Sequence, residues 1–148
     1  MNKRVVNTGL GVVAPNGVGL DAFTHAIKTG ISGIKHDTEL ERLQFSCQIA
    51  GKPEISAELA LQYFSELEMR NFNSTGILYG VIAGIDAWKD AGLSLEIKEE
   101  PDWDSGTIFG SGTSGIDKFR ESIYKIDDLQ TRRLGSTAVA QTMNSGVS

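Results

Sequence analysis

Apolar residues recur at three- and four-residue steps between about Asn71 and Gly92, which is the spacing of one face of an α-helix. These positions are Ile77, Leu78, Val81, Ile82, Ile85 and Trp88. Small residues are interspersed with them, at Gly76, Gly80, Ala83, Gly84 and Ala87. Each glycine costs a helix about 1 kcal/mol relative to alanine. The small residues therefore predict close approach of a neighbouring backbone to a central, tightly packed helix.

Weaker patterns predict further helices. One has Asp21 as its N-cap, an apolar face that includes Phe23 and Ile27, and its end at Gly30, the residue type favoured just past a helix. A second runs from Ile116 to Leu129, and the stretch from Thr137 to Ser148 begins like another helix.

Short β-branched and apolar runs predict strands. Arg4–Thr8 and Thr107–Phe109 are each followed at once by glycines, which indicates buried strands that end in tight turns. Pro15-Asn16-Gly17 is a strong turn signal. Between Ile31 and Ile55 the periodicity is weak, and we expect a short extended piece at Phe45–Ala50 within loop. The order strand, helix, helix, strand, helix predicts a layered α/β fold.

Composition narrows the class of protein. The chain has 148 residues, with 14 Lys and Arg against 19 Asp and Glu, for a net charge of −5. Without clustered cations a nucleic acid is not an expected partner. No window approaches the roughly 18 uninterrupted apolar residues of a membrane span, and the basic start of the chain lacks an apolar signal region. The expected setting is cytoplasmic.

Two glycine patterns raise nucleotide binding as an alternative. Gly9, Gly11 and Ala14 fit G-x-G-x-x-A after a predicted strand, and Gly110-Ser111-Gly112-Thr113-Ser114-Gly115 fits G-x-G-x-x-G between a strand and a helix. Such glycines let a backbone approach a pyrophosphate at a helix N-terminus. However, Pro15 interrupts the first pattern, and no strand ending in an acid follows the second at about 20 residues. A small nucleotide-binding α/β domain stays an open alternative.

Side chains that often carry chemistry are isolated in this sequence. His25 and His36 have no cysteine or histidine at ligand spacing, so surface or half-buried structural roles are expected for them. Cys47 is the single cysteine, which excludes an internal disulfide, and we expect a packed thiol rather than a nucleophile. The acidic residues from Glu96 to Asp104 are expected to form a solvated loop. No catalytic set and no metal site is predicted.

The order of several segments resembles that of β-ketoacyl-acyl-carrier-protein synthases. The similar segments run in the same order along the whole chain: residues 4–17 (RVVNTGLGVVAPNG), 30–34 (GISGI), 79–84 (YGVIAG), 87–93 (AWKDAGL), 109–115 (FGSGTSG) and 143–148 (MNSGVS). The resemblance implies a thiolase-like, layered α-β-α-β-α fold, of which residues 1–148 would be the N-terminal ketosynthase portion. It also explains the glycines as turn and close-packing residues.

The same resemblance implies that this portion ends before the nucleophile. The family uses a cysteine on a later strand-to-helix turn and two histidines further on, and Cys47, His25 and His36 lie in the wrong segments to be these residues. No catalytic residue and no cofactor is therefore expected in this chain. The parent reaction would be decarboxylative Claisen condensation of acyl and malonyl thioesters. A non-catalytic partner subunit of the chain-length-factor type is the alternative.

The resemblance implies functional roles for three residues. Thr113 lies in the glycine turn where the family places a residue that gates the acyl chain, although a plain turn residue is an equal interpretation. Met143 would contribute to the acyl pocket or to a dimer surface. Arg70 is the one cation in residues 66–72, where the family presents basic residues to an acidic acyl carrier protein. The expected partners are a carrier protein and a second ketosynthase subunit, identical or related.

Overall fold

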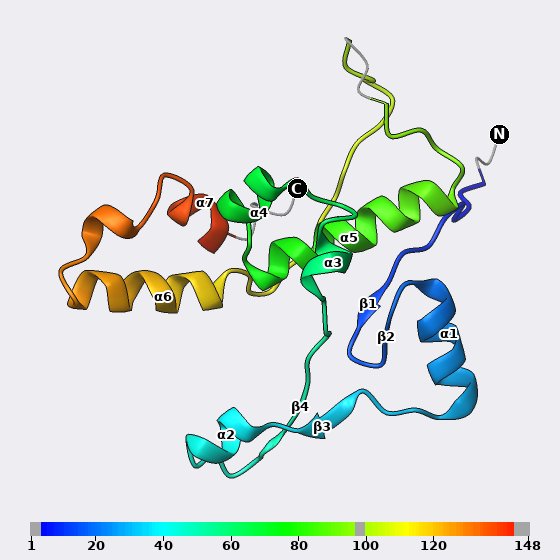
Figure 1. Ribbon diagram of the computed structural model, residues 1–148. Helices are drawn as coiled ribbons and strands as arrows, with labels where there is room; N and C mark the ends of the chain where they lie inside the picture. The colour runs from blue at the N-terminus through cyan, green and yellow to red at the C-terminus, as the bar shows by residue number, and fades with distance from the viewer. Residues whose placement is uncertain (1–3, 97–99, 144–148) are drawn as a thin grey trace. The chain divides into compact units, whose positions relative to one another are not determined.

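The computed structural model describes residues 4–96 and 100–143 (Figure 1). These residues form two compact units. The first contains the chain up to Ser56 together with Ile82–Ser94, and the second contains Ala57–Val81 and the chain from Leu95 onward. The long helix α5 (Thr75–Asp90) therefore begins in the second unit and ends in the first.

The first unit opens with a hairpin and a helix. Strands β1 (Val13–Ala14) and β2 (Gly17–Val18) pair antiparallel around the predicted turn at Pro15 and Asn16. Helix α1 (Leu20–Thr29) follows and ends at Gly30, whose φ of 70° is the left-handed conformation that favours glycine. The turn and the helix end are confirmed. The N-cap prediction was wrong, because the cap is Gly19 and Asp21 lies within the first turn.

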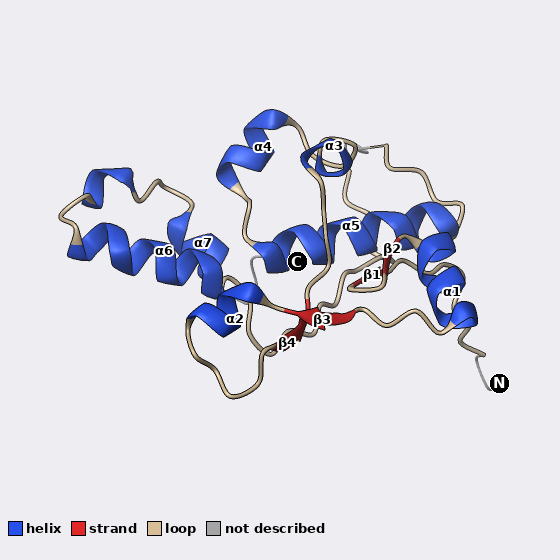
Figure 2. Cartoon of the chain, turned by 60° about the horizontal axis from the view of Figure 1, so that its bottom comes forward, coloured by secondary structure: helices blue, strands red, loops and turns tan. Residues whose placement is uncertain are grey.

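A second hairpin follows in the same unit. Strand β3 (Ile34–His36) pairs antiparallel with β4 (Ile49–Gly51), and the short helix α2 (Thr38–Arg42) lies between them in sequence (Figure 2). The Asp37 carboxylate caps α2 by accepting from the backbone N–H groups of Glu39 and Leu40 at 3.0 and 3.1 Å. The extended piece predicted at Phe45–Ala50 is thus shifted to Ile49–Gly51, and the predicted loop before it contains β3 and α2.

The backbone before the first hairpin lies directly on α5. A Cβ atom added to Gly11 would come within 2.6 Å of the Ala87 nitrogen, and one added to Gly9 within 2.5 Å of the Ala91 nitrogen. Real Cβ atoms do not approach other atoms so closely. The Asp90 carboxylate accepts a hydrogen bond from the Leu10 N–H at 2.9 Å. The small residues of the central helix therefore allow the close backbone approach that the sequence predicts.

The second unit is helical. It contains α3 (Ala57–Ala60), α4 (Glu66–Asn71), the start of α5, α6 (Ile116–Asp127), the 3₁₀ turn η1 (Thr131–Arg133) and α7 (Ala138–Thr142). Helices α6 and α7 contact one another (Figure 1). Gly115, at a φ of 69°, precedes α6, and a Cβ there would lie 2.6 Å from Thr142 Cα. None of the described helices has the length and apolar character needed to cross a bilayer.

The two predicted buried strands are absent from the described structure. Arg4–Thr8 and Thr107–Phe109 are irregular, and the side chains of Val5 and Ile108 are 92% and 99% exposed. Both predictions were wrong for this chain. A strand needs a neighbour to pair its backbone groups, and among the described residues neither segment has a paired strand beside it. The two observed sheets are two-stranded hairpins.

Candidate functional site

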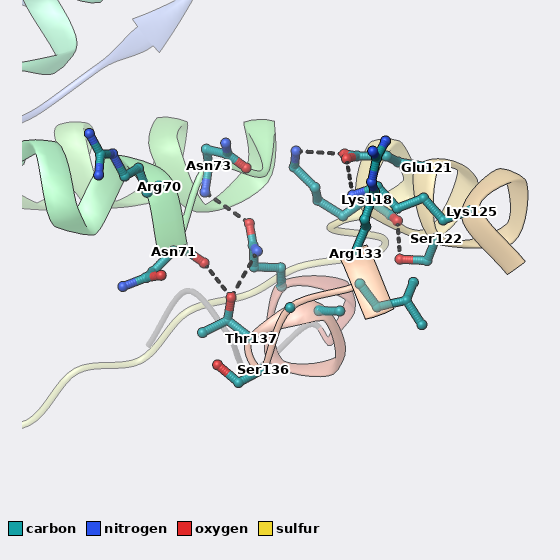
Figure 3. Close-up of a pocket in the computed structure, with 14 residues that line it drawn as sticks. Arg70, Asn71, Asn73, Lys118, Glu121, Ser122, Lys125, Arg133, Ser136 and Thr137 are labelled. Atoms are coloured by element: carbon teal, nitrogen blue, oxygen red, sulfur yellow. Dashed lines mark hydrogen bonds and ion pairs between the residues drawn. The ribbon is translucent and has the colours of Figure 1, made fainter. Parts of the chain in front are cut away.

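A polar pocket lies within the second unit (Figure 3). Its volume is about 270 Å³, and it is lined by residues from α4, α6, η1 and the loop that leads into α7. Its charged residues are Arg70, Lys118, Glu121, Lys125 and Arg133. Four cations and one carboxylate therefore line the pocket, in a chain whose net charge is −5. This concentration of positive charge makes the pocket the leading candidate site of the second unit.

The Glu121 carboxylate is held by two lysines of its own helix. Lys118 donates to one of its oxygens at 2.9 Å, and Lys125 pairs with the other at 2.7 Å. Hydrogen bonds from Lys125 and Lys118 lower the pKa of Glu121 to about 2. The carboxylate therefore keeps its charge at any pH near neutrality, and the pocket keeps a surplus of positive charge.

A buried amide connects α7 to the segment between α4 and α5. Gln141 is 6% exposed, and its Oε1 accepts from the N–H groups of Asn73 and Ser74 at 2.8 and 3.2 Å. Its Nε2 donates to Thr137 Oγ1 at 3.3 Å, and that hydroxyl donates to the Asn71 carbonyl at 2.7 Å (Figure 3). One side chain thus satisfies the backbone donors of the two residues that precede α5.

Replacing Gln141 by leucine is expected to destabilise the second unit by about 1–3 kcal/mol, because the Asn73 and Ser74 N–H groups would be buried without an acceptor. Unfolding by urea, followed through the helical circular dichroism signal, measures this change. Gln62→Leu is the matched control, since Gln62 is exposed. Equal stability of both variants would show that the amide network contributes nothing.

The three residues predicted from the resemblance occupy two different places. Arg70 lies at the pocket, on α4. Thr113 is exposed in the glycine turn before α6. Met143 follows α7, its side chain is 52% exposed, and its carbonyl accepts from the Ser114 hydroxyl at 3.1 Å. The structure therefore brings the Thr113 turn next to the Met143 backbone and leaves Arg70 outside that contact.

The isolated histidines and the cysteine are all exposed. His36 lies 3.6 Å from the Glu41 carboxylate, and Cys47 Sγ lies 4.0 Å from the Ile49 carbonyl. The surface positions of His25 and His36 agree with the surface or half-buried positions that the sequence predicts. The prediction of a packed thiol at Cys47 was wrong, because the loop between α2 and β4 leaves it in solvent. Within the described ranges, no group of three or more His, Cys, Asp or Glu could hold a metal ion.

Sequence reasoning missed Lys118, Lys125, Arg133 and Gln141. The spacing of Lys118, Glu121 and Lys125 at three and four residues is a helical charge pattern that could have revealed the first two. No sequence signal marks Gln141, because its role depends on backbone groups almost 70 residues away.

The glycine patterns do not form phosphate loops in this structure. Gly9 and Gly11 lie against the α5 backbone, which fills the space that a pyrophosphate would need. Gly115 packs against the backbone of α7 in the same way. Gly9, Gly11 and Gly115 are therefore close-packing residues, whereas Gly110 and Gly112 lie in open space.

The arrangement of the chain has a counterpart among solved structures. A crystal structure of a beta-ketoacyl synthase from Burkholderia phymatum STM815 superposes with a TM-score of 0.75 over 99% of this chain and 35% of its own. Its sequence is 22% identical, so this likeness shows the fold alone. The fold is that of a beta-ketoacyl synthase, which is a thiolase-like α/β fold. The expected fold class is confirmed.

Sequence comparison identifies the family. The family model described as "Beta-ketoacyl synthase, N-terminal domain" matches residues 2–148. The 3-oxoacyl-[acyl-carrier-protein] synthase 2 of Vibrio cholerae is 34% identical over 141 residues, 95% of this chain and 33% of that protein. That of Staphylococcus aureus strain COL is 28% identical over 134 residues, 90% of this chain and 31% of that protein. The chain belongs to the beta-ketoacyl synthase N-terminal domain family, and it spans about a third of the length of these relatives.

Proposed function

We propose that this chain is the N-terminal part of a β-ketoacyl-acyl-carrier-protein synthase that takes part in fatty acid or polyketide-like synthesis. The observation that carries the proposal is the match to the family over residues 2–148, with relatives named 3-oxoacyl-[acyl-carrier-protein] synthase 2. The reaction would load an acyl group on a cysteine, decarboxylate a malonyl thioester and join the two. A covalent thioester divides the condensation into two easier steps.

Within such an enzyme, this chain supplies scaffold, part of the acyl pocket and part of a dimer surface. The contact between Ser114 and the Met143 carbonyl supports placing Thr113 and Met143 at one pocket wall. No residue of the chain is assigned to bond making or breaking. The cytoplasmic setting expected from the sequence is part of the same proposal.

We also propose Arg70 as a contact for an acidic acyl carrier protein. Opposite charge across an interface mainly raises the association rate and fixes the register of docking. Arg70 is exposed, and Lys118, Lys125 and Arg133 line the same pocket, which supports a more positive surface than residues 66–72 alone suggest.

The second candidate is a non-catalytic partner subunit of the chain-length-factor type, in heterodimer with a related ketosynthase. The absence of an assigned nucleophile in residues 1–148 is compatible with both candidates. The intact mass of the protein in its native source, followed by the sequence after Ser148, distinguishes them. A cysteine at the next strand-to-helix turn supports the enzyme, and another residue there supports the partner subunit.

Thr113→Phe tests the acyl gate in an active enzyme that contains this chain. Because the turn side chain would project into the channel, the larger ring is expected to reduce kcat/KM for long acyl primers more than for short ones. One methylene in such a pocket typically changes discrimination by about 1–3 kcal/mol. Steady-state rates with acyl primers of increasing length measure the ratio of kcat/KM between long and short primers.

Thr131→Phe is the control for this series, since Thr131 is an exposed threonine of η1. It should leave the ratio between long and short primers unchanged. If Thr113→Phe lowers all rates equally, or none of them, Thr113 is a turn residue and the gate proposal is wrong.

A further inference from the structure

Three successive backbone N–H groups at the start of α5 bind side chains of other helices. Gln141 Oε1, on α7, accepts from Asn73 and Ser74 at 2.8 and 3.2 Å. The Asp117 carboxylate, in the first turn of α6, accepts from Thr75 at 3.1 Å. The start of the long helix is therefore joined to both α6 and α7, which follow it at least 42 residues later in the chain.

The glycine turn that precedes α6 lies between the same helices. It packs on the start of α5, because a Cβ added to Gly76 would lie 3.0 Å from Ser114 Cβ. On the side of α7, the Ser114 hydroxyl donates to the Met143 carbonyl at 3.1 Å. A Cβ added to Gly115 would lie 2.6 Å from Thr142 Cα. The turn is thus held from two sides, and its position depends on how α7 is attached to α5.

Gln141 is the main attachment. It is 6% exposed, and the N–H groups that it binds are buried or partly buried, so water does not readily replace its oxygen. The hydrogen bond from Thr75 to Asp117 is exposed, and water can replace that carboxylate. Loss of the Gln141 amide therefore loosens α7 from α5, because the two backbone donors must move to find another acceptor.

We propose that Gln141 is a positioning residue that holds the turn carrying Thr113 and thereby limits the length of the acyl primer that the enzyme accepts. The proposal rests on the ketosynthase function and the acyl gate proposed above. Gln141 acts through the turn and not by contact with the acyl chain. When the turn is released it can move aside, and long primers gain access relative to short ones.

Primer length is the first readout. In an active enzyme that contains this chain, Gln141→Leu is expected to raise the ratio of kcat/KM between long and short acyl primers about fivefold. This is less than the roughly 10–200-fold that one methylene changes in a pocket, because the turn is released and not removed. Thr113→Phe is expected to change the ratio in the opposite direction. Loss of stability alone would reduce the active fraction and lower the rates with all primers equally, which leaves the ratio unchanged.

Two variants serve as controls for this ratio. Gln141→Glu keeps an oxygen acceptor for the Asn73 and Ser74 N–H groups, so its ratio should stay close to that of the unchanged enzyme. Ser74→Ala removes a fully buried hydroxyl that has no hydrogen-bond partner in the described part of the chain. It should leave the ratio unchanged, although Ser74 lies at the same junction.

A spin label at the turn gives a readout that is independent of catalysis. Thr113 is exposed, so a nitroxide can be attached to Thr113→Cys in a Cys47→Ser background. The electron paramagnetic resonance spectrum reports how fast the label moves. It is expected to be narrower, and the motion faster, when Gln141→Leu is added than when Gln141→Glu is added.

The two readouts separate this proposal from the proposed function. Equal spectra with Gln141→Leu and Gln141→Glu would overturn it, because the turn would not depend on Gln141. Altered spectra with an unchanged primer ratio, in an enzyme whose ratio does respond to Thr113→Phe, would also overturn it. If Thr113→Phe itself leaves the ratio unchanged, the gate proposal fails and the effect on primer length fails with it. The spectra then still decide whether Gln141 holds the turn.

Discussion

The purified 148-residue chain is expected to condense acyl and malonyl thioesters no faster than the uncatalysed reaction. Condensation in this family needs an activated cysteine, and a thiol is activated by a neighbouring base, cation or helix N-terminus. Cys47, the single cysteine, lies in a loop and contacts the Ile49 carbonyl. A carbonyl oxygen cannot take the thiol proton or stabilise a thiolate. A radioactive malonyl assay with a complete synthase of the family as positive control measures the difference.

Cys47→Ser is the control for this expectation. It should leave the background rate unchanged, because the thiol has no assigned role. Turnover above background that disappears in Cys47→Ser would show that Cys47 is a nucleophile and that the assignment of catalysis to residues beyond this chain is wrong.

Gly11→Ala is expected to destabilise the first unit by about 3 kcal/mol, the upper end of the cost of overpacking. The added Cβ would come within 2.6 Å of the Ala87 nitrogen and closer still to the Ala83 carbonyl oxygen. Both atoms belong to the backbone of α5, so no side chain can rotate away to make room. The segment must separate from the helix, which breaks the hydrogen bond from Leu10 to Asp90. Urea unfolding followed by circular dichroism measures the change.

Gly110→Ala is the matched control, because an added Cβ at Gly110 meets nothing within 4 Å and the residue has no left-handed φ. It should change the free energy of unfolding by less than about 0.5 kcal/mol, as surface substitutions do. If Gly11→Ala and Gly110→Ala behave alike, the contact between residues 9–11 and α5 is not formed in solution.

Local signals in the sequence predicted the long helices α1, α5 and α6 but not the short helices α2, α3 and α4. The end of α1 at Gly30 and the existence of α5 and α6 follow from glycine at a left-handed position and from apolar residues at helical spacing. A further signal was present and missed. Ser65 and Glu68 form a capping box in which each side chain accepts from the other's backbone N–H, and this S-x-x-E pattern starts α4.

Strands were harder to predict because their stability is not local. Val5 and Ile108 are typical strand residues, yet both are exposed in irregular backbone, since no strand pairs with either segment in the described chain. Conversely, the hairpin of β3 and β4 forms although the sequence pattern did not predict it. Its residues have weak periodicity, but the pairing of Ile34 with Gly51 and of His36 with Ile49 satisfies their backbones.

The sequence by itself determined the family, the main helices and the turn at Pro15-Asn16, because these depend on residue order and on local backbone preferences. The tertiary structure alone decided which residues share the basic pocket. Arg70 and Arg133 are far apart in the chain, and they line one cavity because Gln141 and Thr137 attach α7 to the backbone between α4 and α5. That attachment depends on hydrogen bonds to backbone groups, which every residue carries and which no sequence pattern reveals.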